Sequence, residues 1–210
     1  MIRVLIADDH AIVRKGLVQI ASESREIDMR GEASEYSSLM RLMKENPCDV
    51  LLLDISMPGK NGIDVLKIVH EQYPKTQVLI LSMYPEDQYA IRALKAGAAG
   101  YLTKDTAPER LVEAILSVSR GKKYITPQVA EMLATHLVTD TEGAPHESLS
   151  DREFQTMRLI ASGKQLSQIA DELSLSPKTV SVYRARVLEK MQLKNNAEMT
   201  HYAIKHGLVE

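Results

Sequence analysis

Short apolar runs alternate with amphipathic stretches along the first 120 residues of the chain. The runs are IRVLIA (2–7), IDMRGEA (27–33), DVLLLDI (49–55), QVLILS (77–82) and GYLT (100–103). Compact apolar runs of this length are typical of strands that are buried on both faces of a sheet. We therefore predict five strands, of which the second is the weakest because it carries charged residues.

The stretches between these runs carry apolar residues three or four positions apart, which predicts helices. The predicted helices are residues 11–22, 35–45, 63–72 and 87–96. Ile12 is one of the apolar positions of the first helix. A fifth helix opens at TAPERL, where we expect Thr106 to cap it and Glu109 to complete a capping box. This alternation predicts an α/β fold, a doubly wound five-stranded parallel sheet with helices on both faces.

The pattern changes after residue 121. Residues 127–138 predict one more helix, and the polar stretch TDTEGAPHES that follows is typical of a linker. From there on the signals are all helical, including a capping box at Ser150 and Glu153 and a helix that starts at Ser176 and Pro177. We predict three parts: a domain over residues 1–121, a linker with a helix over 122–147, and a small all-α domain over 148–210.

Composition narrows the class of protein. No apolar run approaches the roughly 18 residues of a membrane-spanning helix. A single cysteine, Cys48, excludes an internal disulfide framework and favours the reducing cytoplasm. The net charge of -2 is uneven, because residues 148–210 carry 9 basic and 7 acidic residues and residues 1–147 carry 17 and 21. The mildly basic carboxyl segment permits nucleic-acid binding without establishing it.

Polar side chains follow four of the predicted strands. They are Asp8, Asp9, Asp54, Ser82 and Lys104. Because the carboxyl ends of parallel strands share one edge of a sheet, we expect these side chains to converge there. Carboxylates suit Mg2+, and a carboxylate beside Mg2+ can act as a nucleophile toward phosphorus. Taken singly, each of these residues is equally typical of a solvated loop, a turn or a surface position.

Four motifs carry a resemblance to a known family. LIADDH, LLLDISMPGKNG, LILS and GYLTKD resemble the receiver domain of two-component response regulators over about residues 2–120. The resemblance implies that Asp54 is the phosphoryl acceptor. It also implies that Asp9 and Asp54 bind Mg2+ directly, that the backbone carbonyl of Ser56 is a third ligand, and that Asp8 acts largely through water. We interpret His10 as a structural neighbour, since Mg2+ prefers oxygen ligands.

The same resemblance assigns further roles. Lys104 would stabilise the phosphoryl group, and Ser82 and Tyr101 would form a switch pair. Pro58 and Gly59 would shape the loop after the acceptor. Asp105 stands where many receivers have proline, which removes any expectation of a cis-proline in that loop.

The carboxyl-terminal segment has the pattern of a helix-turn-helix. On the predicted second helix, Val180, Tyr183, Val187 and Met191 would face the core. The stretch resembles the LuxR-type DNA-binding domain, so the whole chain resembles a NarL/FixJ-type response regulator. The resemblance implies that Lys178 and Thr179 contact DNA phosphates. It also implies that four residues contact the groove: Ser181, Val182, Arg184 and Arg186. Leu166, Ser181 and Ala185 depart from residues common in this family, so base preference does not carry over.

These observations lead to an expected function with alternatives. We expect a cytoplasmic, Mg2+-dependent regulator of transcription that accepts a phosphoryl group on Asp54 from a sensor histidine kinase and binds double-stranded promoter DNA as a homodimer. The last helix offers Met199, Tyr202 and His206 as contacts between copies. The alternatives are a phosphorylation-dependent protein adaptor, whose helical tail does not touch DNA, and an aspartyl-phosphate phosphohydrolase. Against an enzyme, position 56 is Ser rather than an acid that could protonate a leaving group.

Overall fold

The computed structural model describes residues 1–57, 60–138 and 144–209. The chain divides into two compact units, Met1–Val138 and Thr139–Glu210, and the division falls inside the predicted linker. The predicted loop residues Pro58 and Gly59, and the first five residues of the polar stretch (139–143), lie outside the described residues. In the described part of the chain, each helix is too short or too polar to cross a bilayer.

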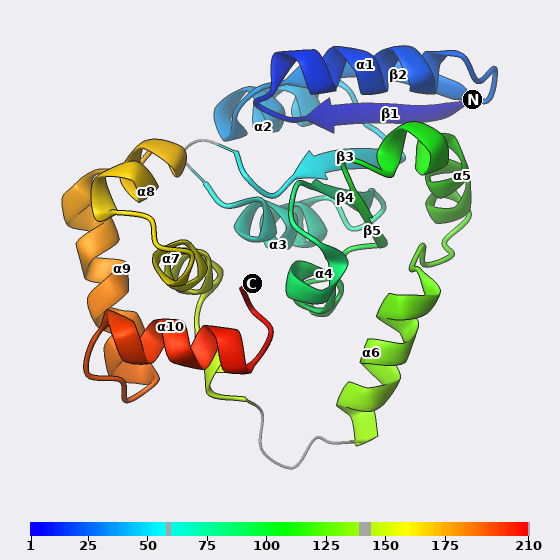
Figure 1. The fold of residues 1–210 in the computed structure, drawn as a ribbon. Helices are drawn as coiled ribbons and strands as arrows, with labels where there is room; N and C mark the ends of the chain where they lie inside the picture. The colour runs from blue at the N-terminus through cyan, green and yellow to red at the C-terminus, as the bar shows by residue number, and fades with distance from the viewer. Residues whose placement is uncertain (58–59, 139–143, 210) are drawn as a thin grey trace. The chain divides into compact units, whose positions relative to one another are not determined.

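The first unit is built on one sheet. Its strands are all parallel, in the order β2-β1-β3-β4-β5 (Figure 1). Their bounds are β1 Ile2–Ala7, β2 Ile27–Ala33, β3 Val50–Asp54, β4 Gln77–Ser82 and β5 Gly100–Thr103. The five strands are those that the apolar runs predicted, and the parallel sheet is confirmed.

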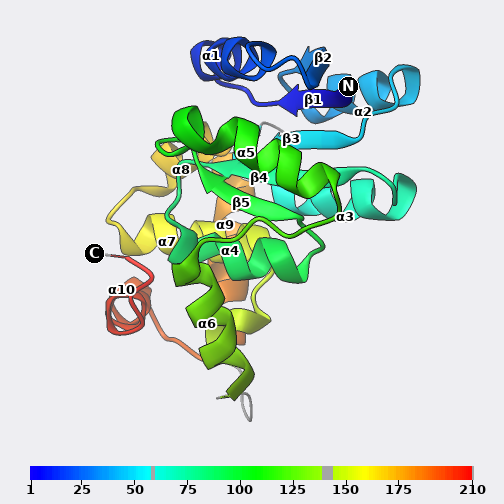
Figure 2. The ribbon, with the colours of Figure 1, turned by 90° about the vertical axis from the view of Figure 1, so that its right-hand side faces the viewer.

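Five helices cover the two faces of this sheet. They are α1 Ala11–Ser22, α2 Tyr36–Glu45, α3 Gly62–Gln72, α4 Glu86–Lys95 and α5 Ala107–Ser119. Helices α1 and α5 lie on one face, and α2, α3 and α4 lie on the other (Figures 1 and 2). One set of alternating strand residues, such as Val4 and Leu52, packs with Leu111 and Ile115 of α5 in a fully buried cluster. The doubly wound prediction is therefore confirmed.

The predicted cap of α5 is wrong. Thr106 precedes α5, but its side chain makes no cap hydrogen bond, because its hydroxyl bonds instead to Thr103 Oγ1 at 2.9 Å. The predicted capping box with Glu109 is absent. Ile12 lies on α1 but is 89% exposed, so it contributes nothing to the core.

The predicted linker helix is present as α6 Pro127–Val138, and it packs against α4 within the first unit. Val129 is 1% exposed, and the hydroxyl of Thr126 donates a hydrogen bond to Glu86 at the start of α4. Just before α6, Tyr124 forms a parallel bridge with Gly100 on the outer edge of β5. The first unit therefore extends through α6.

The second unit is helical. Its elements are η1 Pro145–Ser148, α7 Asp151–Ala161, α8 Leu166–Glu172, α9 Pro177–Lys190 and α10 Asn196–Lys205. The predicted capping box of α7 is confirmed, and Glu153 also accepts a bond from Lys190 Nζ of α9 at 2.6 Å. Ser176 caps α9 as predicted, and its Oγ accepts a hydrogen bond from the Thr179 N–H. Helix α9 packs on α7 and α8, which forms the helix-turn-helix.

Candidate functional site

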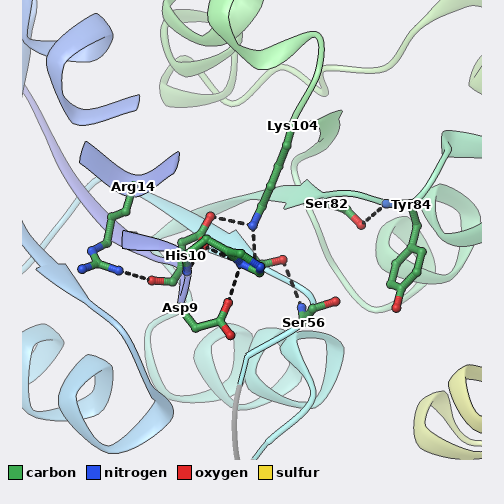
Figure 3. Close-up of polar contacts among 9 residues, drawn as sticks. Asp9, His10, Arg14, Ser56, Ser82, Tyr84 and Lys104 are labelled. Carbon is green, nitrogen blue, oxygen red and sulfur yellow. Dashed lines mark hydrogen bonds and ion pairs between the residues drawn. The ribbon is translucent and has the colours of Figure 1, made fainter. Parts of the chain in front are cut away.

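The acidic residues lie where the strand order reverses, between β1 and β3. Ligands of open parallel sheets collect at this point, outside the carboxyl ends of the strands. Asp8 follows β1 and Asp54 ends β3, and both are fully buried. Lys104, from the loop after β5 (Figure 3), reaches between them, with its Nζ 2.7 Å from an oxygen of each. Of the four strand ends predicted to converge, three are in direct contact here, and Ser82 at the fourth contacts Tyr84 instead.

Asp54 is held by three different contacts. Its Oδ1 accepts a hydrogen bond from the Ser56 N–H at 3.0 Å, and its Oδ2 accepts one from Lys104 Nζ at 2.7 Å. Its backbone carbonyl packs against Gly62, where an added Cβ would lie 2.3 Å from that oxygen. Glycine at position 62 therefore lets α3 start directly against the acceptor strand.

Burial and charge set the protonation of this pair. Burial raises the pKa of Asp54, the neighbouring Asp8 carboxylate adds to the rise, and Lys104 opposes it. Burial alone would lower the pKa of Lys104, but its contacts with Asp54 and Asp8 raise that pKa on balance. Lys104 Nζ lies 2.7 Å from Asp8 Oδ2 as well, so one ammonium group is shared by two carboxylates. A site with two buried acids and one base has an excess of negative charge.

Asp9 and His10 complete the cluster at its solvent side. His10 Nδ1 lies 2.8 Å from Asp9 Oδ1, 3.4 Å from Asp8 Oδ1 and 3.8 Å from Asp54 Oδ2. One donor atom from each of these four residues lies within 4.8 Å of the others, as a metal site requires. The sequence analysis interpreted His10 as a neighbour outside the ligand set, whereas its ring lies among the acids.

Arg14 is a residue near the site that was not predicted from the sequence. Its Nη1 donates a hydrogen bond to the Asp8 carbonyl oxygen at 2.6 Å (Figure 3). Its Nε donates one to Glu32 Oε2 at 3.0 Å. It lies four residues after His10 on α1, so it secures the loop that carries the acids. Nothing in the residue pattern distinguished it from an ordinary surface arginine.

The predicted switch residues are joined through Tyr84. Ser82 Oγ accepts a hydrogen bond from the Tyr84 N–H at 3.0 Å, and the Tyr101 hydroxyl donates one to the Tyr84 carbonyl oxygen at 2.8 Å. The Tyr84 ring stacks on Tyr89 of α4 with centroids 4.8 Å apart. Tyr101 is 1% exposed, so in this structure it already points inward. The sequence carried no signal for Tyr84.

The second unit presents α9 as a candidate nucleic-acid interface. Val180 and Val187 are fully buried and Met191 nearly so, which confirms the predicted core side of this helix. On the other side, Lys178, Ser181, Val182, Ala185 and Arg186 are exposed, whereas Thr179 and Arg184 are partly buried. Such a surface has small side chains near its amino end and a basic residue further along, which suits groove and phosphate contacts.

Some predicted contact residues of this unit are engaged elsewhere. The Thr179 hydroxyl shares a hydrogen bond with Ser176 Oγ at 2.8 Å, and Arg184 Nε donates one to Asn196 Oδ1 at 2.6 Å. The prediction that Met199 is exposed for a contact between copies is wrong, because Met199 is fully buried. Tyr202 is partly buried and His206 is exposed.

Two protein families match the chain. The response regulator receiver domain matches residues 4–116, and the luxR family of bacterial regulatory proteins matches residues 147–203. The response regulator UvrY of Escherichia coli is 37% identical over 209 residues, which cover 99% of this chain and 96% of that protein. The response regulator GacA of Pseudomonas aeruginosa is 36% identical over 211 residues, which cover 100% of this chain and 99% of that protein.

The chain also matches the solved structure of a response regulator. RcsB from Salmonella enterica serovar Typhimurium, bound to a promoter in the presence of the phosphomimetic BeF3-, matches with a TM-score of 0.61 and 27% identity. The match covers 96% of this chain and 97% of that one. With its receiver fold, its acidic cluster and its helix-turn-helix, the chain belongs to the response regulators of the NarL/FixJ type.

Proposed function

We propose that this protein accepts a phosphoryl group on Asp54 from a sensor histidine kinase and then regulates transcription from promoter DNA. The observation that carries the proposal is the buried Asp54–Lys104 pair in the same chain as an exposed recognition helix. In the transfer, a carboxylate oxygen of Asp54 forms the bond to phosphorus while the bond between phosphorus and the kinase's histidine nitrogen breaks. Lys104 Nζ lies where it neutralises charge on the transferred group.

The acidic cluster fits a divalent cation. Asp9 Oδ1 is a buried oxygen that accepts no hydrogen bond in the described part of the chain, and Lys104 supplies one positive charge to two carboxylates, those of Asp8 and Asp54. We propose Mg2+, held by Asp9, Asp54 and the backbone carbonyl of Ser56, with Asp8 acting through water. When bound, the ion would neutralise the oxygens of the incoming phosphoryl group.

The phosphorylated state differs from the free one at the β4–α4 segment. A phosphate adds about -1.5 to -2 charge beside Ser82, so we propose that Ser82 turns its hydroxyl toward it. That turn would break the hydrogen bond from the Tyr84 N–H and release the segment that leads to α4. We propose that the resulting rearrangement promotes homodimers and double-stranded DNA binding, as RcsB binds a promoter in the presence of a phosphomimetic.

We propose that the protein is not an enzyme on a separate substrate and that it works in the cytoplasm with the DNA it reads. Its chemistry would be limited to acceptance and hydrolysis of its own phosphoryl group. In support, position 56, two residues after Asp54, is Ser, so an acid that could protonate a leaving group is missing there. Release of phosphate from metabolites over many turnovers would contradict this.

The proposal is tested by a mobility shift with DNA selected from random sequences. Acetyl phosphate and Mg2+ should raise the affinity of the wild type for the selected site, and Asp54→Ala should abolish that gain. Asp28→Ala, an acid on β2 far from the acceptor in the strand order, serves as the matched control and should keep the gain. A gain that persists in Asp54→Ala would contradict the proposal, and absent or salt-insensitive DNA binding would favour the adaptor alternative.

A further inference from the structure

We propose that His10 is a direct ligand for divalent transition-metal ions such as Mn2+ and Co2+, so that these ions bind this site more tightly than Mg2+ does. The inference rests on the proposed cation site and goes beyond it, because the ligands assigned above for Mg2+ are all oxygens. It makes His10 the residue that determines metal specificity.

The first support is the position of the imidazole nitrogen. His10 Nδ1 lies 2.8 to 3.8 Å from one oxygen each of Asp9, Asp8 and Asp54. With metal–ligand bonds of about 2.1 Å, two ligands at right angles are about 3.0 Å apart and two opposite ligands about 4.2 Å. The three distances fall close to or between these values. The nitrogen therefore lies within reach of an ion that these carboxylates would hold.

The second support is the contact between His10 and Asp9. Asp9 Oδ1 is buried and accepts no hydrogen bond that the described residues supply, yet it lies 2.8 Å from His10 Nδ1. Two lone pairs at this separation repel each other. The contact is favourable when Nδ1 carries a hydrogen that it donates to Asp9, or when a metal ion is bound by both atoms.

The third support is that Lys104 and His10 contact the acidic residues from opposite sides. Lys104 Nζ contacts Oδ2 of Asp8 and Oδ2 of Asp54 from the side of β5. His10 approaches from α1, its side chain is 53% exposed, and its backbone N–H is fixed to Asp8 Oδ1 at 2.7 Å. An ion entering from solvent would thus meet the imidazole and the Asp9 carboxylate first (Figure 3).

The types of ligand atom determine which metal ions bind more tightly when His10 is a ligand. Mg2+ takes oxygen ligands and keeps its waters, so it gains little from an imidazole. Later first-row ions bind imidazole well, and for a given nitrogen and oxygen site their affinity rises from Mn2+ to Co2+. A site that adds one imidazole to the carboxylates of Asp9 and Asp54 therefore discriminates in favour of Co2+ over Mg2+.

The experiment uses the full-length protein and two readouts. In the first, pulsed electron paramagnetic resonance of the Mn2+-loaded wild type should show the nitrogen coupling of a coordinated imidazole, and His10→Ala should lose it. In the second, calorimetric titration should show that His10→Ala lowers the affinity for Co2+ at least about tenfold, the scale of losses from disturbed metal sites. Its affinity for Mg2+ should stay within about twofold.

The controls separate this inference from the proposed function. His201→Ala removes an exposed histidine of the second unit and should change neither affinity. Nitrogen coupling that is absent from the wild type, or that persists in His10→Ala, overturns the role of His10, as does an equal loss of Co2+ and Mg2+. Because the wild-type spectrum requires no variant to fold, this readout stands by itself. A wild type that binds neither ion would overturn the cation site of the proposed function as well.

Discussion

Cys48 illustrates how burial changes the chemistry of one residue. It lies just before β3, is 7% exposed and contacts Thr76, whose hydroxyl also donates to the Cys48 carbonyl oxygen at 2.9 Å. Burial raises the pKa of its thiol to about 11. The sequence analysis placed a lone cysteine in a reducing compartment, and its packing here makes it a core residue rather than a reactive one.

The raised pKa of Cys48 predicts a pH dependence of stability. A thiol whose pKa is higher in the folded state contributes stability that is complete below pH 9 and is lost as the pH rises toward 11. Relative to Cys48→Ala, the wild type should lose about 2 kcal/mol of unfolding free energy between pH 8 and pH 11. Urea unfolding of both proteins across this range measures the difference. If the unfolding free energies of the two proteins changed with pH in the same way, the raised pKa of the Cys48 thiol would be contradicted.

At the scale of elements, helix starts show which sequence signals are reliable. Ser150 and Thr106 both stand before a helix with Glu three residues later, yet only Ser150 forms the capping box. Thr106 has a helical backbone conformation, with φ -90° and ψ -15°, whereas Ser150 is extended, with φ -62° and ψ 161°. A capping side chain reaches the helix N–H groups only from the extended conformation, so the turn after β5 decides the outcome.

This difference predicts unequal costs for the same type of substitution. Ser150→Ala should destabilise its unit by about 1 kcal/mol, the usual loss for a cap. Thr106→Ala should cost only a few tenths, since it removes no cap bond. Urea unfolding followed by pulsed hydrogen exchange and mass spectrometry reads each unit separately. Equal losses in the two variants would be inconsistent with these cap geometries.

At the scale of the whole molecule, the first unit carries a series of contacts from Ser82, at the end of β4, to Thr126, just before α6. Tyr84 accepts from the Tyr101 hydroxyl and donates its N–H to Ser82, and two residues later Glu86 bonds the hydroxyl of Thr126. Residues 122–147 were predicted to be a linker with a helix, and that helix, α6, packs on α4. The last helix of the first unit, α6, therefore packs against the same β4–α4 region that the switch residues contact.

The bond between Glu86 and Thr126 predicts that α6 can be loosened selectively. Glu86→Asp keeps a carboxylate at the start of α4 but shortens its reach. The loss of about 1 kcal/mol from one hydrogen bond should speed amide exchange in α6 about fivefold. Hydrogen exchange of the full-length protein measures this, with the exchange of β1 as the internal reference. Unchanged exchange in α6 would show that Glu86 does not hold it.

Much of the fold and of the acceptor pocket follows from local sequence. Buried parallel strands need unbroken apolar runs such as LLLD, and strands of one direction bring Asp8, Asp54 and Lys104 to the same edge. These features depend on the pattern of apolar residues and on the shared direction of the strands, so they could be predicted for individual residues. The helix bounds and the cap at Ser176 follow for the same reason.

Other features depend on contacts between residues far apart in the chain. The ring of His10 lies among the acids, Tyr84 joins Ser82 to Tyr101, and α6 docks on α4. Met199 is buried because α10 turns that side toward α7. Each outcome is set by the rotamer and the neighbours available after packing, and no periodicity encodes it. The sequence alone determined which residues reach the sheet edge, and the tertiary structure decided which of them touch.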